Sequence, residues 1–317
     1  MLYCVASGGP ALREEGMAGK RSDTAPWGKR LKVQLLGIIA FNGYLWAPWG
    51  KYACLPVLNC YACPASTTAC PIGSMKEFAA ARRFPYYVIG SLGLAGLAVG
   101  RAFCGWLCPF GWLQDLLYRI RGPKLRLPRA ANWVKYALLV SLVIALPAID
   151  GKPEEEVAAD TVVKEDTGAR NFCSLVCPAG TLEASVPSLL YSQPLREAAT
   201  WRTYSKIGLL VGFLGLMVFF RRGFCRGACP LGAVMAVVSP ISMLRLRTDR
   251  EKCTRCMRCV RVCPTDCREV PREAGQKEAT AECVLCLDCV RACPEEGALS
   301  AWLGRRMVSV SRGRGNA

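Results

Sequence analysis

Four stretches of the chain are almost entirely apolar, and each is about as long as a membrane-spanning helix requires. They run from about 33 to 49, 86 to 103, 133 to 149 and 204 to 220. A helix needs roughly 17 residues to cross the hydrocarbon core of a bilayer. Trp46 and Trp49 end the first stretch and Trp133 opens the third, as expected of interfacial aromatic belts. The pattern predicts four transmembrane helices; the alternative is the buried helical core of a soluble protein.

The polar residues between these stretches predict an orientation. The short loop 104–132 carries five Lys or Arg residues and a single acid, Asp115, whereas the longer loop 150–203 has five bases and an acidic run at 154–156. Short basic loops stay on the cytoplasmic side, so both termini are predicted to be cytoplasmic, in the inner membrane. Four bases of the first loop oppose this orientation: Lys51, Lys76, Arg82 and Arg83.

Composition supports a membrane protein with basic flanks. Of the 317 residues 52% are hydrophobic, and 41 Lys and Arg against 24 Asp and Glu give a net charge of +17. Such an excess fits nucleic acid, anionic lipid or cytoplasmic loops. The bases gather beside apolar stretches, at Arg119, Arg121, Lys124, Arg126, Arg129, Arg221, Arg222 and Arg226. No basic stripe with interleaved aromatic residues lies elsewhere, so we predict contact with membrane lipid and no nucleic-acid partner.

Cysteine dominates the residues that can bind a redox metal. The chain has 20 cysteines and no histidine. A bis-histidine haem, a Rieske centre and a zinc site that uses histidine are therefore excluded within this chain. Any redox centre is expected to be held by thiolates.

Two C-terminal runs repeat the spacing C-x2-C-x2-C-x3-C-P. The first is Cys253, Cys256, Cys259 and Cys263, and the second is Cys283, Cys286, Cys289 and Cys293. A cubane cluster presents one iron to each thiolate, and a tight turn with two-residue gaps can direct three sulfurs to three irons. Zinc knuckles or a disulfide framework are the alternatives, but neither accounts for the repeated C-P ending.

The two runs resemble the ligand runs of a bacterial-type ferredoxin with two 4Fe-4S clusters. That resemblance implies that the runs exchange their last ligand. Cluster 1 would then be bound by Cys253, Cys256, Cys259 and Cys293, and cluster 2 by Cys283, Cys286, Cys289 and Cys263.

We therefore predict an all-α membrane four-helix bundle with a C-terminal α+β ferredoxin domain. The expected domains are a disordered cytoplasmic tail at 1–30, a four-span membrane domain at 31–245, the ferredoxin domain at 246–302 and a disordered basic tail at 303–317.

The loops between the apolar stretches share a second cysteine motif that ends in C-P-x-G. It is complete at Cys104–Gly111, Cys173–Gly180 and Cys225–Gly232, and a variant copy runs from Cys60 and Cys63 to Cys70–Gly73. Proline ends the incoming helix and suits the first position of the next, while glycine permits close backbone approach. The sulfurs are thus expected to point at a helix break.

The predicted topology pairs these motifs on the two faces of the membrane. Cys104, Cys108, Cys225 and Cys229 would meet on the cytoplasmic face as a third metal or cluster site, with Arg101, Arg222 and Arg226 offsetting its charge. On the outer face a fourth site would draw on Cys60, Cys63, Cys70, Cys173 and Cys177, with Cys54 nearby. Redox-active dithiols or packing cysteines are the alternative inside, and disulfides are the alternative outside.

The combination of these motifs resembles a known group of membrane proteins. Cys104–Pro109 and Cys225–Pro230 at span ends, followed by Cys253–Pro294, are similar to the membrane-bound polyferredoxins related to NapH of periplasmic nitrate reductase systems and to the C-terminal part of NosR. The resemblance implies four spans, two cytoplasmic 4Fe-4S clusters and electron transfer between the quinone pool and partner proteins. The outer motifs depart from that pattern.

The predicted function is electron transfer of the quinol dehydrogenase type, between the quinone pool or a cytoplasmic donor and a redox partner or companion subunit. Glu77, Asp115 and Glu183 lie near the motifs and are candidates to accept a proton from quinol. No acidic residue or lysine lies in the middle of a span, which disfavours an intramembrane proton pump. The alternative is a maturation factor that reduces a metal or disulfide of another protein through the membrane-face dithiols.

Overall fold

The computed structural model describes residues 28–44, 47–63, 65–150, 170–197, 199–267 and 281–313. Three sequence predictions lie outside these residues: the tail up to residue 27, the acidic run at 154–156 and the end of the chain after residue 313.

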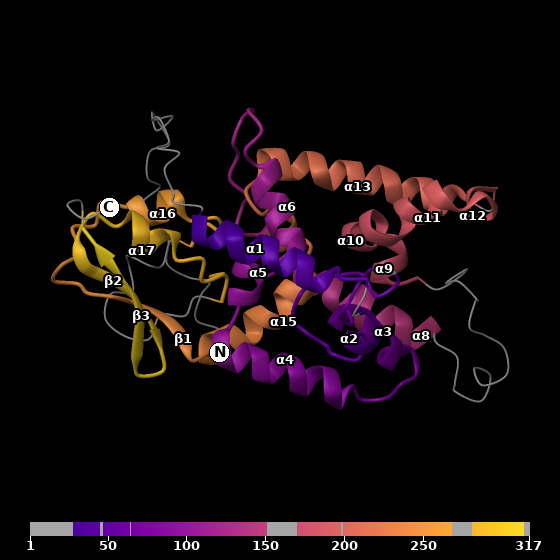
Figure 1. Cartoon of the computed structure of the whole chain (residues 1–317), viewed down its shortest axis with the longest axis horizontal. Helices are drawn as coiled ribbons and strands as arrows, with labels where there is room; N and C mark the ends of the chain where they lie inside the picture. Colours follow the sequence, from indigo (N-terminus) through magenta and orange to yellow (C-terminus); the bar gives the residue numbers. More distant parts are fainter. Residues whose placement is uncertain are drawn as a thin grey trace.

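A small sheet and a group of longer helices occupy opposite sides of the molecule (Figure 1). On one side lie β1 (Leu244–Thr248), β2 (Glu296–Leu303), β3 (Arg306–Arg312), α16 (Arg258–Val262) and α17 (Asp288–Ala292). The longer helical segments are α1 (Gly28–Phe41), α4 (Tyr86–Val99), the continuous run α7 (Ala131–Leu138), η1 (Leu139–Ala145) and α8 (Leu146–Asp150), and α13 (Trp201–Phe219).

Short helices fill the connections between these long segments. They are α2 (Ala47–Gly50), α3 (Pro71–Ala80), α5 (Ala102–Trp106), α6 (Pro109–Leu117), α9 (Phe172–Leu175), α10 (Pro178–Gly180), η3 (Thr181–Ser185), α11 (Val186–Tyr191), α12 (Gln193–Glu197), α14 (Gly223–Gly227), α15 (Pro230–Val238) and η4 (Ser239–Ile241). Several begin at a cysteine motif, so the helix breaks expected from C-P are where the chain turns.

Two of the four predicted spans are helices long and apolar enough to cross a membrane within the described chain. They are the runs Ala131–Asp150 and Trp201–Phe219. The helix Tyr86–Val99 is apolar but shorter, with 14 residues. The two longer runs bury only 17% and 11% of their most apolar windows within the protein, which leaves most of their apolar side chains facing outward.

The first predicted span, 33–49, is not one helix. α1 ends at Phe41, where Asn42 and Gly43 follow, and the short α2 comes after it. The carbonyl groups at the end of α1 are capped by a later loop, since Asn59 Nδ2 donates to Phe41 O at 2.7 Å and Thr67 Oγ1 donates to Ala40 O at 2.8 Å. A polar side chain that satisfies a terminal carbonyl favours ending the helix there.

The sheet is antiparallel in the order β1-β2-β3, and it extends beyond the predicted ferredoxin domain. Residues 303–313 were expected to belong to a disordered basic tail, and this expectation is wrong for them because β3 pairs with β2. Gly304 takes φ +59° in the turn between the two strands, a conformation that glycine adopts readily. Ser311 Oγ donates to Glu295 O at 2.7 Å and anchors β3.

A buried ionic network joins the ferredoxin side to the helices. Asp115 on α6 accepts from Arg30 at 2.5 Å and from Arg222 at 2.7 Å, and Arg30 also reaches Asp288 on α17 at 3.1 Å. Burial alone would raise the pKa of Asp115, but Arg222 and Arg30 hold its pKa at about 2. The network therefore stays charged throughout the neutral range.

Replacing Asp115 by Ala should destabilise the protein by roughly 3 to 5 kcal/mol, because two buried guanidinium groups lose their partner. The measurement is thermal unfolding in detergent, with Glu77→Gln on the exposed side of α3 as a control that changes little. The folded pKa of Asp115 lies below its unfolded value of about 3.9, so its stabilising contribution is present above pH 4 and is lost as the pH falls toward 2. A D115A variant with an unchanged unfolding midpoint would contradict this role.

Candidate iron-sulfur sites

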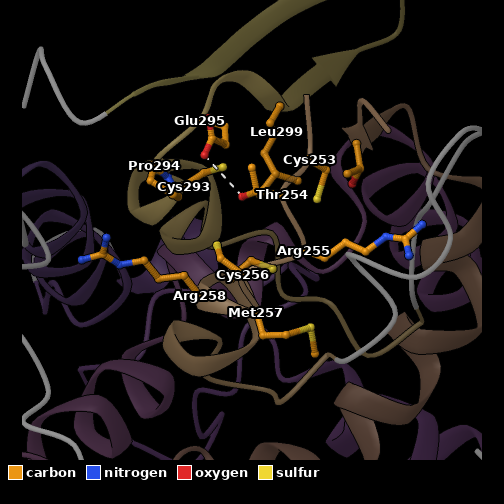
Figure 2. A pocket seen from close by; sticks show the side chains of 13 residues that line it. Cys253, Thr254, Arg255, Cys256, Met257, Arg258, Cys293, Pro294, Glu295 and Leu299 are labelled. Carbon is orange, nitrogen blue, oxygen red and sulfur yellow. Dashed lines mark hydrogen bonds between the residues drawn. The ribbon is translucent and has the colours of Figure 1, made fainter. Parts of the chain in front are cut away.

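The first C-terminal cysteine run lines a hollow that is partly open to solvent and has about 380 Å³ of empty space, with the open part included. Its lining includes the thiols Cys253, Cys256, Cys259 and Cys293, the last of which comes from the second run. Figure 2 shows Cys256 and Cys293 on opposite walls, with Arg255 and Arg258 reaching outward to either side. The four side chains predicted for cluster 1 therefore line one hollow.

A second hollow of about 330 Å³ is lined by the other predicted set. Cys263, Cys283, Cys286 and Cys289 surround it, and Cys259 and Cys267 also contribute to its wall. Cys259 lines both hollows, so the two sites are neighbours. The exchange of last ligands implied by the ferredoxin resemblance agrees with this placement.

The backbone of the two runs is bent in the same way. The residues on either side of each middle cysteine have positive φ: Arg255 53°, Met257 57°, Leu285 48° and Leu287 61°. Such conformations cost side-chain-bearing residues about 1 to 3 kcal/mol each and persist at functional sites where the surroundings require them. Alternating right- and left-handed residues turn successive N–H groups inward, a concavity that many Fe–S sites use.

The thiol groups are not arranged around a single ion. Among the described residues, no three cysteine or carboxylate side chains converge as ligands of one metal. A cubane binds each thiolate through a different iron, so its ligands surround a volume rather than a point. The two hollows fit a 4Fe-4S cluster better than the zinc alternative.

A third group of thiols lies between α5, α6, α14 and α15. Cys104, Cys108, Cys225 and Cys229 are all buried. Burial, followed by repulsion from Cys225 and Cys104, raises the pKa of Cys108 to about 12, and burial with repulsion from the same two thiols raises the pKa of Cys229. The structure thus brings together the four cysteines predicted for the inner membrane-face site.

The C-P-x-G motifs explain how these thiols are aimed. Cys108 and Cys229 are the N-cap residues of α6 and α15, with proline at the first helical position. The N–H of Gly232 donates to Cys229 Sγ at 3.4 Å. A side chain at Gly111 would meet Cys104 O at 2.9 Å, so glycine is required for the close approach. A helix N-terminus also stabilises a negatively charged sulfur.

Buried cations face this inner group of thiols. Arg101 and Arg222 are fully buried, and each stands three residues before the first cysteine of a motif. Arg101 Nη1 pairs with Glu282 at 2.9 Å, yet its Nε and Nη2 atoms have no hydrogen-bond partner in the described part of the chain. Buried N–H groups without a partner call for an acceptor, and with Cys104 and Cys225 nearby they fit an anionic centre, because a cluster with four thiolates carries net negative charge.

Four of the six outer cysteines form a fourth group. Burial raises the pKa of Cys70 to about 12 and that of Cys177 well above its usual range, in both cases with added repulsion from Cys173 and Cys60. Cys70 and Cys177 are again N-caps followed by proline, at α3 and α10. Cys63, which was predicted as part of this site, and Cys54 are also buried, but neither is among the thiols whose repulsion raises the pKa of Cys70 or Cys177.

The comparisons with known proteins point to the same chemistry. A family model described as a 4Fe-4S binding domain matches residues 87–128, 168–186 and 204–247, which include the three complete C-x3-C-P motifs. A second 4Fe-4S binding domain model matches residues 246–269, which include the first ferredoxin run. Over these residues the chain is similar to 4Fe-4S ferredoxin-type proteins. The likeness to NosR expected from the motifs is confirmed.

Relatives of this 4Fe-4S protein come from distant organisms. An uncharacterized protein of Methanocaldococcus jannaschii is 30% identical over 57% of the chain and 66% of its own length. The regulatory protein NosR of Pseudomonas aeruginosa is 29% identical over 52% of the chain and 20% of its own length. The methylamine utilization ferredoxin-type protein MauN of Methylorubrum extorquens is 26% identical over 80% of both chains. No solved structure matches the chain.

The chain spans just under two thirds of the Methanocaldococcus protein and a fifth of NosR. The activity of each whole protein therefore does not follow from the match.

The three carboxylates predicted near the motifs differ in their burial and in their partners. Asp115 is fixed as an anion in the ionic network, and Glu77 is exposed and pairs with Lys76 at 2.9 Å. Glu183 is different, since burial raises its pKa to about 7 while it accepts the Cys60 N–H at 2.7 Å. Only Glu183 of the three combines burial with a raised pKa.

Sequence inspection missed two donors to the inner thiols. Gln114 Nε2 donates to Cys225 Sγ at 2.9 Å, and the backbone N–H of Leu58 donates to Cys108. Cys267, which belongs to none of the cysteine motifs, is buried beside Cys263 and donates its N–H to that thiol at 3.4 Å. These contacts depend on tertiary packing, and no sequence motif predicts them.

The crossed ligand sets can be tested by EPR of the reduced protein. Cys253→Ser and Cys293→Ser should each remove about four irons per chain and leave the same remaining signal, because both remove cluster 1. Cys283→Ser and Cys263→Ser should both remove cluster 2 and leave the signal of cluster 1. If Cys293→Ser instead matched Cys283→Ser, each run would bind its own cluster and the crossed assignment would be wrong.

Proposed function

We propose that this protein is a multi-cluster electron-transfer subunit of the cytoplasmic membrane, which passes electrons between a quinone or cytoplasmic donor and a soluble redox partner. The observation that carries the proposal is the direct contact between the inner thiols and the second ferredoxin site. Cys104, Val284 and Cys286 form one buried apolar cluster. Electrons can then pass from one centre to the next within a single chain.

The third centre in this proposal is a 4Fe-4S cluster bound by Cys104, Cys108, Cys225 and Cys229. Support comes from their burial, from the N-cap geometry of Cys108 and Cys229, and from the buried cations around them. Iron-sulfur clusters transfer one electron and need no proton at the metal, which suits a site without nearby water. The bound cluster would supply the redox step, while the chain supplies ligands and compensating charge.

The ferredoxin domain is held against this inner site by close backbone contact. Trp106 Nε1 donates to Leu285 O at 2.9 Å. A side chain at Gly105 would lie 2.3 Å from Val284 O, so this approach requires glycine. Arg101 and Lys135 both pair with Glu282, next to Cys283, at 2.9 and 2.6 Å. The domain is thus docked in one fixed position.

We place four spans in the membrane, with both termini in the cytoplasm. Apolar side chains face outward on all four helical segments: Leu36 is 65% exposed, Leu94 72%, Val140 59% and Val211 62%. Exposed apolar surface on this scale marks contact with lipid or another protein. Arg30 at the start of α1, Lys135 at the start of α7 and Arg221 at the end of α13 all contact the ferredoxin side, which supports alternating helix directions.

Cluster 1 is proposed as the site that exchanges electrons with a soluble partner protein. Cys256 is exposed at the surface, and Arg255, Arg258 and Arg261 surround it. A basic rim around an exposed centre attracts and orients an acidic carrier. The partner is therefore expected to be an acidic one-electron protein.

The alternative function, reduction of a partner's metal or disulfide by free dithiols, receives less support. The inner thiols are between 6% and 8% exposed, so another protein cannot reach them without unfolding. A quinone remains the candidate substrate at the outer side, where Glu183 is the buried carboxyl available to accept a proton.

Replacing Cys229 by Ser should lower the iron content by about four atoms per chain and leave both ferredoxin signals in the EPR spectrum. The iron and acid-labile sulfide content per chain is measured on anaerobically purified protein. Cys54→Ser, which alters a buried cysteine outside the four groups, is the matched control and should keep full iron. An unchanged iron content in C229S would count against the third cluster.

Charge reversal at Arg255 and Arg261 should slow electron exchange with a soluble acidic ferredoxin by about tenfold or more at low salt. The same substitutions at Arg305 and Arg306, exposed at the turn between β2 and β3, are the control. Stopped-flow rates measured at several ionic strengths distinguish the two surfaces. Equal slowing in both double variants would mean that net charge, and not this site, attracts the partner.

A further inference from the structure

Much of the loop from Cys54 to Cys70 is buried although none of its described residues lies in a helix or a named strand, and only its tip around Tyr61 is strongly exposed, with Tyr61 at 57%. Val57, Leu58, Asn59 and Ser66 are all less than 3% exposed. Two of its polar groups bond α1, since Asn59 Nδ2 and the Thr67 N–H both donate to Phe41 O. Irregular backbone at membrane depth is tolerated where protein covers it. The loop therefore folds back into the helices instead of lying on the outer surface.

This loop brings Cys60 and Cys70 to Cys173 and Cys177. The four come from separate places: the loop, the start of α3, the helix α9 and the start of α10, on the side away from the sheet (Figure 1). A Cβ atom built on Gly180 would lie 3.5 Å from Cys60 Sγ and 3.7 Å from Cys177 Sγ. The two sulfurs thus face each other across the space that a glycine leaves open.

The geometry of this outer group repeats that of the inner group. The N–H of Gly180 donates to Cys177 Sγ at 3.4 Å, as that of Gly232 does to Cys229 Sγ. Cys70 and Cys177 have the same extended N-cap backbone as Cys108 and Cys229, followed by proline. Two N-cap thiols plus two further thiols make up each set.

The outer and inner groups are close to each other. The backbone N–H of Leu58 hydrogen bonds the thiol of Cys108, a member of the inner group. Cys60 follows two residues later, and two extended residues span at most about 7 Å. Leu58, Cys108 and Cys177 also belong to one packed core. An electron that moves between the two groups would therefore pass through well-packed protein and one short stretch of backbone.

We propose that Cys60, Cys70, Cys173 and Cys177 bind a fourth iron-sulfur cluster, and that the segment Leu58–Cys60 couples this cluster to the inner one. The coupling rests on the proposed function, since it needs a cluster at the inner site. In each transfer one cluster loses a single electron and the other gains it, with no bond or proton changed. The electron that the outer cluster gives up is replaced by a quinol or another reductant of the outer side.

The assignment of four cysteines out of six makes the test specific. Cys173→Ser in the full-length chain, purified anaerobically in detergent, should contain about four fewer irons and keep the EPR signals of the other centres. Cys63→Ser, in the same loop but outside the set, is the matched control and should keep all iron. Full iron content in C173S, or equal loss in C63S, would overturn the assignment.

A second variant leaves every thiol in place. Gly180→Leu directs a side chain between Cys60 and Cys177 and should displace the cluster, while Gly73→Ala, with its nearest contact at 3.8 Å, should retain it. Thermal unfolding shows whether each variant is folded. A folded G180L with full iron content would contradict the proposal, as would a disulfide between any two of the four cysteines in the anaerobically purified protein.

The coupling between the two clusters has its own readout. When both are reduced, spin coupling should broaden their EPR lines, and the broadening should vanish in Cys173→Ser. Eight to twelve irons with intact ferredoxin signals would reject the fourth cluster and leave electron transfer standing, whereas fewer than about eight irons would reject the ferredoxin clusters themselves. Sharp, uncoupled lines from two reduced centres would reject the coupling alone.

Discussion

The structure depends on balancing negative charge that is buried with the thiols. A cluster bound by four thiolates is an anion, and an uncompensated charge in a protein interior is strongly unfavourable. Arg101 and Arg222 sit beside the inner thiols, fully buried. Each also pairs with a carboxylate, Glu282 or Asp115. The same two side chains therefore stabilise the centre and join it to the ferredoxin domain, so that cluster binding and domain docking rely on shared residues.

A small repeated unit carries most of the cysteines of the helical part. In each C-P-x-G motif cysteine occupies the N-cap position of a helix and proline starts the helix. At Gly111, Gly180 and Gly232 the glycine also lets another group approach. Because each unit supplies only two thiols, a site needs two units from distant parts of the chain. Packing of the long helices therefore decides which thiols meet.

Much of the ferredoxin part could be predicted from the sequence, because its spacing is local. The residues around Cys256 and Cys286 must turn within two residues, and the positive φ angles of Met257 and Leu287 show how they do. The crossed placement of Cys263 and Cys293 came from resemblance and not from spacing. The β3 strand was missed because Met307, Val308 and Val310 lie among arginines, and the charge obscured a short alternating pattern.

The helical part was less predictable, since its groups of cysteines are assembled by tertiary contacts. The lengths of the apolar stretches predicted the long helices, but they placed the end of the first helix beyond Phe41. The groups that cap this helix, on Asn59 and Thr67, lie far along the chain. Topology indicated which cysteines share a face. Topology could not predict whether Cys60 or Cys63 joins the outer group. The two are three residues apart in one irregular loop, and without helical or strand periodicity the sequence does not indicate which side chain points toward α10.

The hydrogen bonds donated to the inner sulfurs affect more than their position. Gln114 and Leu58 each direct an N–H toward a thiol of this group, and buried guanidinium groups lie beside it. Such donors stabilise the reduced, more negative form of a cluster and so raise its reduction potential. The cluster proposed for this site would therefore hold an electron more tightly than it would without these donors, and it would act as a reservoir that buffers supply from one side against demand from the other.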